Sequence, residues 1–137
     1  MTLTIEIVTP ERRVHTGDAD SVVLPTTAGQ VEILPGHIPL TTEVEPGEII
    51  VKRAGAKEDR LVVDKGFARV LGDSVSILTE AAVNKEQIDM ELVAAAEKRA
   101  QAVLEAARTQ DTLDPAEVEK MEQILRFAAV QRLIKRR

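Results

Sequence analysis

The chain has 137 residues, of which 44% are hydrophobic and 30% charged, as expected for a folded protein with one ordinary domain or one small domain plus an appendage. It contains no cysteine, which excludes a disulfide framework, a thiolate nucleophile and a cysteine-ligated zinc site. The net charge of −5 and the aromatic content of 1% argue against nucleic acid as a partner, because attraction to phosphates and platforms for base stacking are both lacking.

The first residues alternate as a strand from Leu3 to Ile7, without the layout of a signal peptide. No apolar run is long enough to predict a transmembrane helix. These two observations favour a cytoplasmic protein.

The chain up to Val83 follows the period-two alternation of β-strands. The pattern starts at 3–7 and recurs at 21–24, 48–53, 60–63, 67–71 and 74–78. Turn residues such as Pro46-Gly47 and Gly72-Asp73 separate the runs. Many short strands without intervening helices predict a β-sandwich or barrel and argue against a parallel α/β sheet.

The sequence changes at Asn84, after which good helix formers dominate up to Arg108. Either Asn84 or Asp89 is suited to cap the start of this first helix. A polar linker at 109–113 is followed by Asp114-Pro115, a capping residue and a proline at the first helical position. The sequence therefore predicts a β domain over 1–83 and an antiparallel two-helix hairpin over 84–137.

The first helix has an alanine-rich apolar face, which we expect to hold the hairpin weakly because alanine buries little area. The residues of this face are Leu92, Ala96, Ala100, Val103 and Ala107. The second helix has an apolar stripe wide enough for more than one neighbour. Two alternatives follow: the hairpin rests on the β domain, or it is mobile and has two docking surfaces.

Basic residues gather at the end of the chain, and no acidic residue follows Glu122. They are Arg126, Arg132, Lys135, Arg136 and Arg137. Cations at this position stabilise the negative end of a helix dipole. They also form a local site for an acidic protein surface, which is the second interpretation.

Catalytic chemistry has few candidates, because the chain has only two histidines. We expect His15 to be an exposed strand residue and His37 to cap backbone groups in a turn. The motifs for zinc, calcium and phosphate binding are missing from the sequence. The sequence thus predicts a chain that is no enzyme by itself and has neither a metal nor a resident cofactor.

Residues 29–40 read GQVEILPGHIPL, which predicts a strand, a turn with Gly36 at positive φ and a short second strand. This segment resembles the signature of the epsilon subunit of F-type ATP synthases, except that Glu32 stands at the second glycine. Residues 45–47 and 66–70 are similar to further motifs of that family, with Lys65 and Arg69 as departures.

The resemblance implies an antiparallel β-sandwich of about ten strands followed by a helical hairpin. It implies a non-catalytic rotor subunit of the central stalk that contacts the gamma subunit and the c-ring and inhibits ATP hydrolysis by extending its hairpin. The subunit would lie peripherally on the cytoplasmic face of an inner or thylakoid-type membrane. The rotor-facing loop would comprise Gly29, Gln30, Glu32, Pro35, Gly36, His37 and Pro39.

In this reading the basic residues of the hairpin would reach the catalytic alpha and beta subunits. Some family members bind ATP through a motif that begins as Ile88-Asp89 does here. Leu92 replaces its phosphate-pairing arginine, so we expect ATP to bind weakly or not at all, with Arg99 and Arg126 as the remaining cationic candidates. The alternative function is a free-standing β-sandwich that binds a ligand beneath a helical lid.

Overall fold

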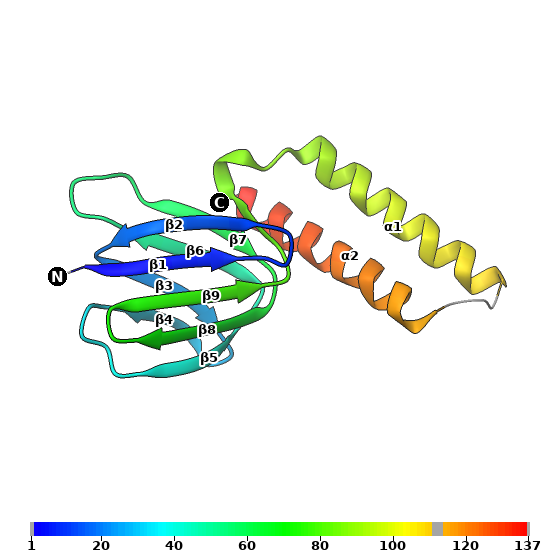
Figure 1. The fold of residues 1–137 in the computed structure, drawn as a ribbon. Helices are drawn as coiled ribbons and strands as arrows, with labels where there is room; N and C mark the ends of the chain where they lie inside the picture. The colour runs from blue at the N-terminus through cyan, green and yellow to red at the C-terminus, as the bar shows by residue number, and fades with distance from the viewer. Residues whose placement is uncertain (1, 111–113, 137) are drawn as a thin grey trace. The chain divides into compact units, whose positions relative to one another are not determined.

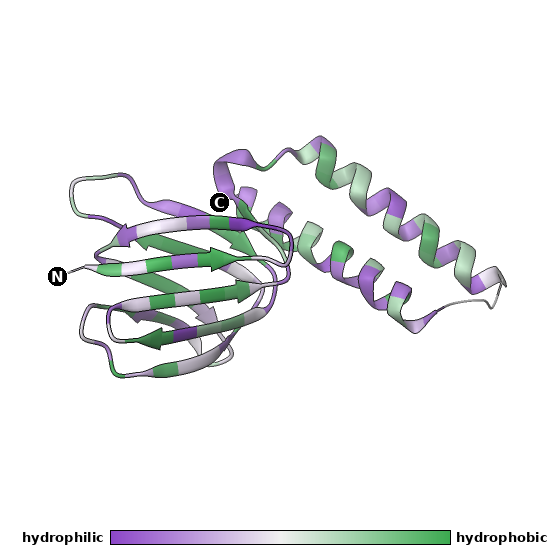
Figure 2. Ribbon diagram, viewed as in Figure 1, coloured by the Kyte–Doolittle hydropathy of each residue, from purple (hydrophilic) through white to green (hydrophobic). Residues whose placement is uncertain are grey.

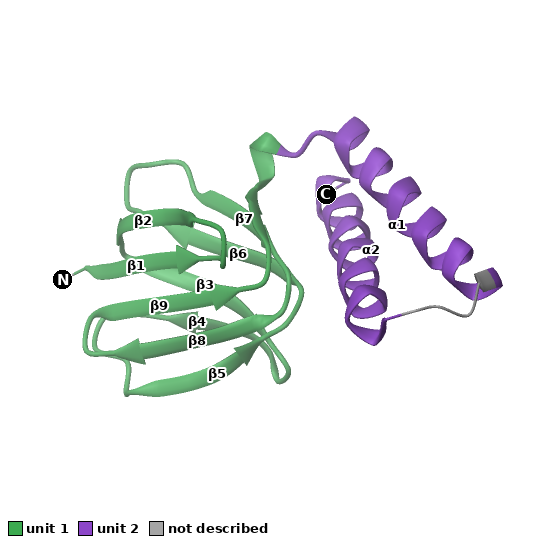
Figure 3. Cartoon of the chain, turned by 45° about the vertical axis from the view of Figure 1, so that its right-hand side comes forward, with its two compact units in different colours: residues 1–87 green, residues 88–137 purple. Residues whose placement is uncertain are grey.

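The computed structural model describes residues 2–110 and 114–136. The chain divides into two compact units, residues 1–87 and 88–137 (Figure 3). The predicted division between residues 83 and 84 falls inside the last strand, Ala82–Asn84, before the short helix that ends the first unit.

Unit 1 is a sandwich of two five-stranded sheets (Figure 1). Its strands are β1 Leu3–Val8, β2 Arg13–Ala19, β3 Ser21–Thr26, β4 Gly29–Ile33, β5 Leu40–Val44, β6 Gly47–Lys52, β7 Asp59–Val63, β8 Gly66–Leu71, β9 Ser74–Thr79 and β10 Ala82–Asn84. One sheet has the order β2-β1-β9-β8-β5 and the other β10-β7-β6-β3-β4. A single-turn 3₁₀ helix, η1 Lys85–Gln87, ends the unit. The predicted sandwich is confirmed.

The core lies between the sheets and is built from aliphatic side chains. Inward residues such as Ile5, Leu24, Ile49 and Ile77 are fully buried, whereas their neighbours along each strand face outward. Figure 2 shows this alternation as changing colour along the strands.

The sandwich departs from the purely antiparallel expectation in one place. Strand β1 pairs in parallel with β9, with Thr4 opposite Ser74 and Val8 opposite Leu78. Parallel neighbours need a long connection, and here the intervening strands supply it in place of a helix.

Unit 2 consists of helices α1 Met90–Gln110 and α2 Pro115–Lys135, which pack against each other as a hairpin (Figure 1). Asp89 caps α1, because its Oδ1 accepts from the backbone N of Glu91 at 2.9 Å. Asn84 instead lies in β10. Asp114 caps α2 as predicted, accepting from Ala116 N at 3.0 Å.

The expected linker and the expected packed face of α1 both need correction. Thr109 lies inside α1, and its hydroxyl donates to the carbonyl of Ala106 at 2.9 Å, while residues 111–113 lie outside the described part of the chain. Leu92 and Val103 are 68% and 41% exposed, whereas Val93 is buried. The other three residues of the expected face lie on the packed side, because Ala100 is buried and Ala96 and Ala107 are half-buried, so the packed face is rotated only partly, from Leu92 toward Val93.

Candidate functional site

The loop from Leu34 to Pro39 connects the two sheets at one edge of the sandwich. It leaves β4, the edge strand of one sheet, and enters β5, the edge strand of the other. Gly36 has a φ of 86°, as predicted, and His37 N donates to Leu34 O at 3.1 Å. The Nδ1 of His37 donates to the carbonyl of Ile38 at 2.7 Å, so this side chain does cap a backbone group.

Apolar side chains dominate the exposed surface of this loop. Ile38 is 75% exposed and Leu34 is 53% exposed. A signal for them was available in the sequence, since each directly precedes a proline in a segment that forms no regular strand. They were missing from the predicted set, which contains only the glycines, prolines and polar residues around them.

The predicted loop residues do not form one cluster. Gly29 and Gln30 lie at the start of β4, in the turn from β3, where the hydroxyl of Thr26 donates to Gly29 O at 2.6 Å. Pro35 lies beyond the other end of this five-residue strand, five residues after Gln30 and so about 17 Å from it at the usual rise per residue. Glu32, on β4 itself, pairs with Lys52 at 3.8 Å.

A second candidate surface is a row of apolar side chains across the outer face of the β2-β1-β9-β8-β5 sheet. Leu78 lies directly opposite Val8 on β1 and opposite Phe67 on β8. Phe67 is 59% exposed and Leu78 is 58% exposed. Val8, Phe67 and Leu78 are called the apolar row below. Apolar side chains that lie next to one another on neighbouring strands and remain exposed are typical of an interaction surface.

The apolar row borders a cavity of about 720 Å³ whose lining residues all belong to unit 1. Acidic Glu43 and Glu45 lie on its rim, together with Lys65. Thr79 also lines it, and the buried Oγ1 of that residue has no hydrogen-bond partner among the described residues. The cavity therefore fits an apolar group of a partner, with polar groups beside it.

Gly66 lets the strands that form this surface approach each other closely. A Cβ atom built there would lie 1.9 Å from the carbonyl oxygen of Leu78 and 2.7 Å from Thr79 Cα. The sequence motif at 66–70 thus contains a glycine that the pairing of β8 with β9 requires.

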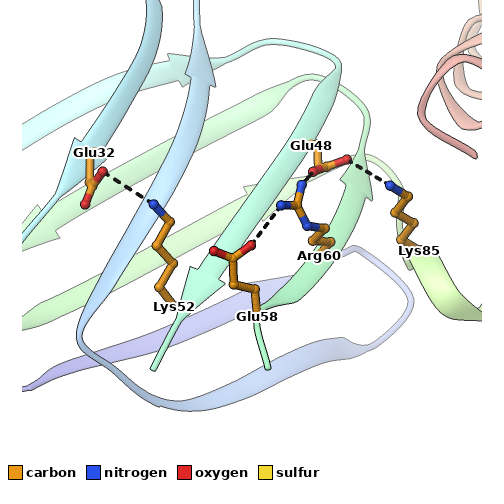
Figure 4. Close-up of polar contacts among 6 residues, drawn as sticks. All are labelled: Glu32, Glu48, Lys52, Glu58, Arg60 and Lys85. Carbon is orange, nitrogen blue, oxygen red and sulfur yellow. Dashed lines mark hydrogen bonds and ion pairs between the residues drawn. The ribbon is translucent and has the colours of Figure 1, made fainter. Parts of the chain in front are cut away.

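An ionic cluster holds the end of unit 1 onto the sandwich (Figure 4). The carboxylate of Glu48 is 7% exposed and binds Arg60, which also donates to Glu58 at 2.8 Å. Lys85 of η1 lies 3.9 Å from Glu48. The next residue, Glu86, pairs with Lys57, so two consecutive residues of η1 are tied to the sandwich.

The basic residues at the end of the chain are not equivalent. Arg132 binds Glu97 of α1, whereas Lys135 and Arg136 are exposed. Arg126 is half-buried, and Arg137 lies outside the described residues. Although no acidic residue follows Glu122 in the sequence, Arg132 does have an opposing carboxylate, because Glu97 comes from the other helix.

The nucleotide candidates are not gathered around the motif at 88–89. Ile88 is buried, and Asp89 uses its carboxylate to cap α1. Arg99 lies about 15 Å further along the helix at 1.5 Å per residue. Exposed Leu92 offers no cation for a phosphate.

His15 lies on β2 and is half-buried, not exposed as expected. Burial lowers its pKa, the nearby Arg53 lowers it further, and Asp59 opposes both.

Among the described residues, no group of three or more histidine or acidic side chains is placed to hold a metal ion. No described helix is long and apolar enough to cross a membrane.

Sequence comparison places these features in one family. Residues 2–85 match the family model for the β-sandwich domain of the ATP synthase delta/epsilon chain. The chain is 36% identical over 135 residues to ATP synthase epsilon chain 2 of Ralstonia nicotianae, covering 98% of this chain and 97% of the relative. It is 34% identical over 137 residues to the epsilon chain of Herminiimonas arsenicoxydans, covering 99% and 98%.

Solved structures of ATP synthases contain chains with the same fold. A chain of the Euglena gracilis mitochondrial ATP synthase (OSCP/F1/c-ring) superposes with a TM-score of 0.68 at 25% identity, covering 97% of this chain and 81% of that one. A chain of the Tetrahymena thermophila central stalk and c-ring shares the fold, with a TM-score of 0.58 at 11% identity and coverage of 98% and 97%. This chain therefore belongs to the ATP synthase epsilon-chain family and is a non-catalytic subunit.

Proposed function

We propose that the sandwich unit of this chain binds the gamma subunit and the c-ring in the central stalk, and that its helical unit restrains ATP hydrolysis. The observation that carries the proposal is the apolar row, since Phe67 and Leu78 are both more than half exposed on a folded domain. The Euglena and Tetrahymena neighbours support it, because both come from assemblies that contain a c-ring.

The apolar row is the surface that we assign to the gamma subunit. Full burial of one large apolar side chain stabilises a complex by about 1.5–3 kcal/mol. Phe67 and Leu78 have more than half of that area available, so together they contribute about 2–3 kcal/mol on docking. The acidic rim at Glu43 and Glu45 suits basic residues on the partner.

The loop 34–39 is the surface that we assign to the c-ring. Its backbone is shaped by Gly36 and two prolines, and it presents Leu34 and Ile38 outward. A preshaped loop loses little conformational entropy on binding, which suits a contact that must transmit torque. The predicted residues Gly29 and Gln30 lie at the far end of β4 and form a separate part of this edge.

The helical unit would act on the catalytic alpha and beta subunits through its basic end. Lys135, the last residue of α2, and Arg136, its C-cap, are exposed and suit an acidic protein surface. ATP binding by this unit would be weak or absent, since Leu92 is apolar and Asp89 is used as a cap. The subunit itself would be attached to the membrane only through the complex, on the cytoplasmic face.

The gamma contact is tested by comparing Phe67→Ser with Leu71→Ser. Both side chains are exposed apolar residues of β8, 59% and 54% respectively, but Leu71 lies opposite Ser74, outside the apolar row. Affinity for the purified gamma subunit, measured by calorimetry, is expected to fall about tenfold or more for Phe67→Ser, equivalent to about 1.4 kcal/mol. Equal affinities for the two variants would overturn the assignment.

The c-ring contact is tested separately with Ile38→Ser in the assembled enzyme. We expect gamma binding to stay intact and proton-driven ATP synthesis to fall. Thr41→Ala, an exposed change on the adjacent β5, is the matched control. Synthesis at the wild-type rate in the Ile38 variant would remove the loop from the rotor contact.

A further inference from the structure

Arg132 has a partner within the helical unit. Its Nε lies 2.6 Å and its Nη2 lies 2.5 Å from Oε1 of Glu97. Glu97 is two turns into α1, whereas Arg132 is one turn before the end of α2. The ion pair therefore ties the basic end of the hairpin back to the beginning of its first helix.

The seam beside this ion pair is thin. Ala100 and Ala128, one turn from Glu97 and from Arg132, are buried, and a methyl group buries little apolar area. Charge-assisted hydrogen bonds are therefore a larger share of what holds the helices together at this end than they would be beside a leucine seam.

The ion pair is also exchangeable. The side chain of Arg132 is 39% exposed and that of Glu97 is 23% exposed, so water and a competing carboxylate can reach the guanidinium. An arginine fork of this kind binds any carboxylate presented in the right plane.

We propose that Glu97 is a competitor for the basic end of this subunit: it holds Arg132 in the closed hairpin and gives it up to a carboxylate of a catalytic subunit in the open one. The inference rests on the proposed restraint of ATP hydrolysis and adds the residue that sets its strength. One guanidinium thus serves two states, and the affinity of Glu97 for it determines how readily the hairpin opens.

The proposal predicts opposite effects for the two partners. Glu97→Gln releases Arg132 with its charge intact, so the hairpin opens more often and ATP hydrolysis is inhibited more strongly. Arg132→Gln also loosens the hairpin, but it removes the group that the catalytic subunits would bind, so inhibition weakens. A purely structural ion pair predicts that both changes move inhibition in the same direction.

Opening is measured on the isolated full-length chain, independently of ATP hydrolysis. The chain has no native cysteine, so spin labels can be attached at Gln101→Cys on α1 and Ala129→Cys on α2, both exposed positions. We expect Glu97→Gln to raise the long-distance population up to about fivefold, the range of a partly exposed ion pair. Glu105→Gln, an exposed acid of the same helix, is the matched control and leaves it unchanged.

Salt provides a second readout on the same labelled chain. Raising the ionic strength from about 0.05 M to about 0.5 M should open the wild-type hairpin and change Glu97→Gln little, because its ion pair is already gone. Unchanged distances in Glu97→Gln, or equal salt responses in the two proteins, would overturn the proposal that the pairing of Glu97 with Arg132 keeps the hairpin closed.

Hydrolysis by the reassembled complex completes the test. Stronger inhibition by Glu97→Gln and weaker inhibition by Arg132→Gln support the exchange, while shifts of the same sign overturn it. If the labels show opening but removal of residues 88–137 leaves hydrolysis unchanged, the proposed restraint fails and the role of Glu97 as a competitor fails with it, leaving only an internal ion pair.

Discussion

Replacing Gly66 with alanine is expected to disrupt the sandwich at the apolar row. The added Cβ would lie 1.9 Å from Leu78 O, 2.7 Å from Thr79 Cα and 2.9 Å from Leu78 C. All three atoms belong to the backbone of β9, so no side-chain rotation relieves the clash. Because an ordinary carbon–oxygen contact is about 3.3 Å, the strands must separate by more than about 1 Å.

The cost follows from the kind of atoms involved. Overpacking a core side chain costs about 1–3 kcal/mol, and a backbone clash in a paired strand lies at or above the upper end of that range. A loss of about 3 kcal/mol in a domain of this size lowers the melting temperature by roughly 12–24 °C. Since the chain has neither Trp nor Tyr, the change is best followed by circular dichroism during thermal and urea unfolding.

Gly17→Ala is the matched control. Gly17 also lies within a strand, but the nearest atom to its added Cβ is a guanidinium nitrogen of Arg53 at 4.0 Å. This variant should unfold within about 0.5 kcal/mol of the wild type. A Gly66→Ala protein as stable as Gly17→Ala would refute the argument from close strand approach.

Three further changes probe other features of the structure. Burial lowers the pKa of His15, so as the pH falls the unfolded chain takes up a proton on this histidine before the folded chain does, and the free energy of unfolding should decrease between about pH 7.5 and about pH 5. The urea midpoint of His15→Asn should lose this part of its pH dependence. The same pH dependence in both proteins contradicts the argument. Arg60→Leu removes the hydrogen-bonding partner of the buried Glu48 carboxylate and should lower the free energy of unfolding in urea by about 1–3 kcal/mol. The double variant Arg60→Leu/Glu48→Gln should regain part of this stability, whereas purely additive losses from the two changes would count against the pair. Asp114→Ala should cost about 1 kcal/mol and speed hydrogen exchange in the first turn of α2 alone, whereas unchanged exchange there would show that the cap is unimportant.

Local signals in the sequence determined much of this protein. Alternation of side chains located most strands, since a half-buried strand must place apolar residues at every second position. Asp114-Pro115 fixed the start of α2 and Gly36 fixed a turn with positive φ, because capping and steric limits act within a few residues. Alternation did not locate strand β2, since residues 13–18 lack a regular apolar pattern, although His15 was expected to lie in a strand.

Only the tertiary structure decided which distant residues meet. The parallel pairing of β1 with β9 joins residues about 70 positions apart, and it creates the apolar row from Val8, Phe67 and Leu78. The alternation along each strand already indicated that these side chains face outward, but their position next to one another depends on strand order and register. Neither is encoded in any one strand.

The helical unit shows the same limit. Two apolar stripes of α1 are nearly equal in the sequence, and packing buries Val93 while leaving Leu92 exposed. That rotation also turns Glu97 toward Arg132, an ion pair between residues 35 positions apart. The sequence by itself thus determined most of the elements and the cap of α2, through interactions within a few residues. Pairings between elements, which depend on the whole fold, were decided by the tertiary structure.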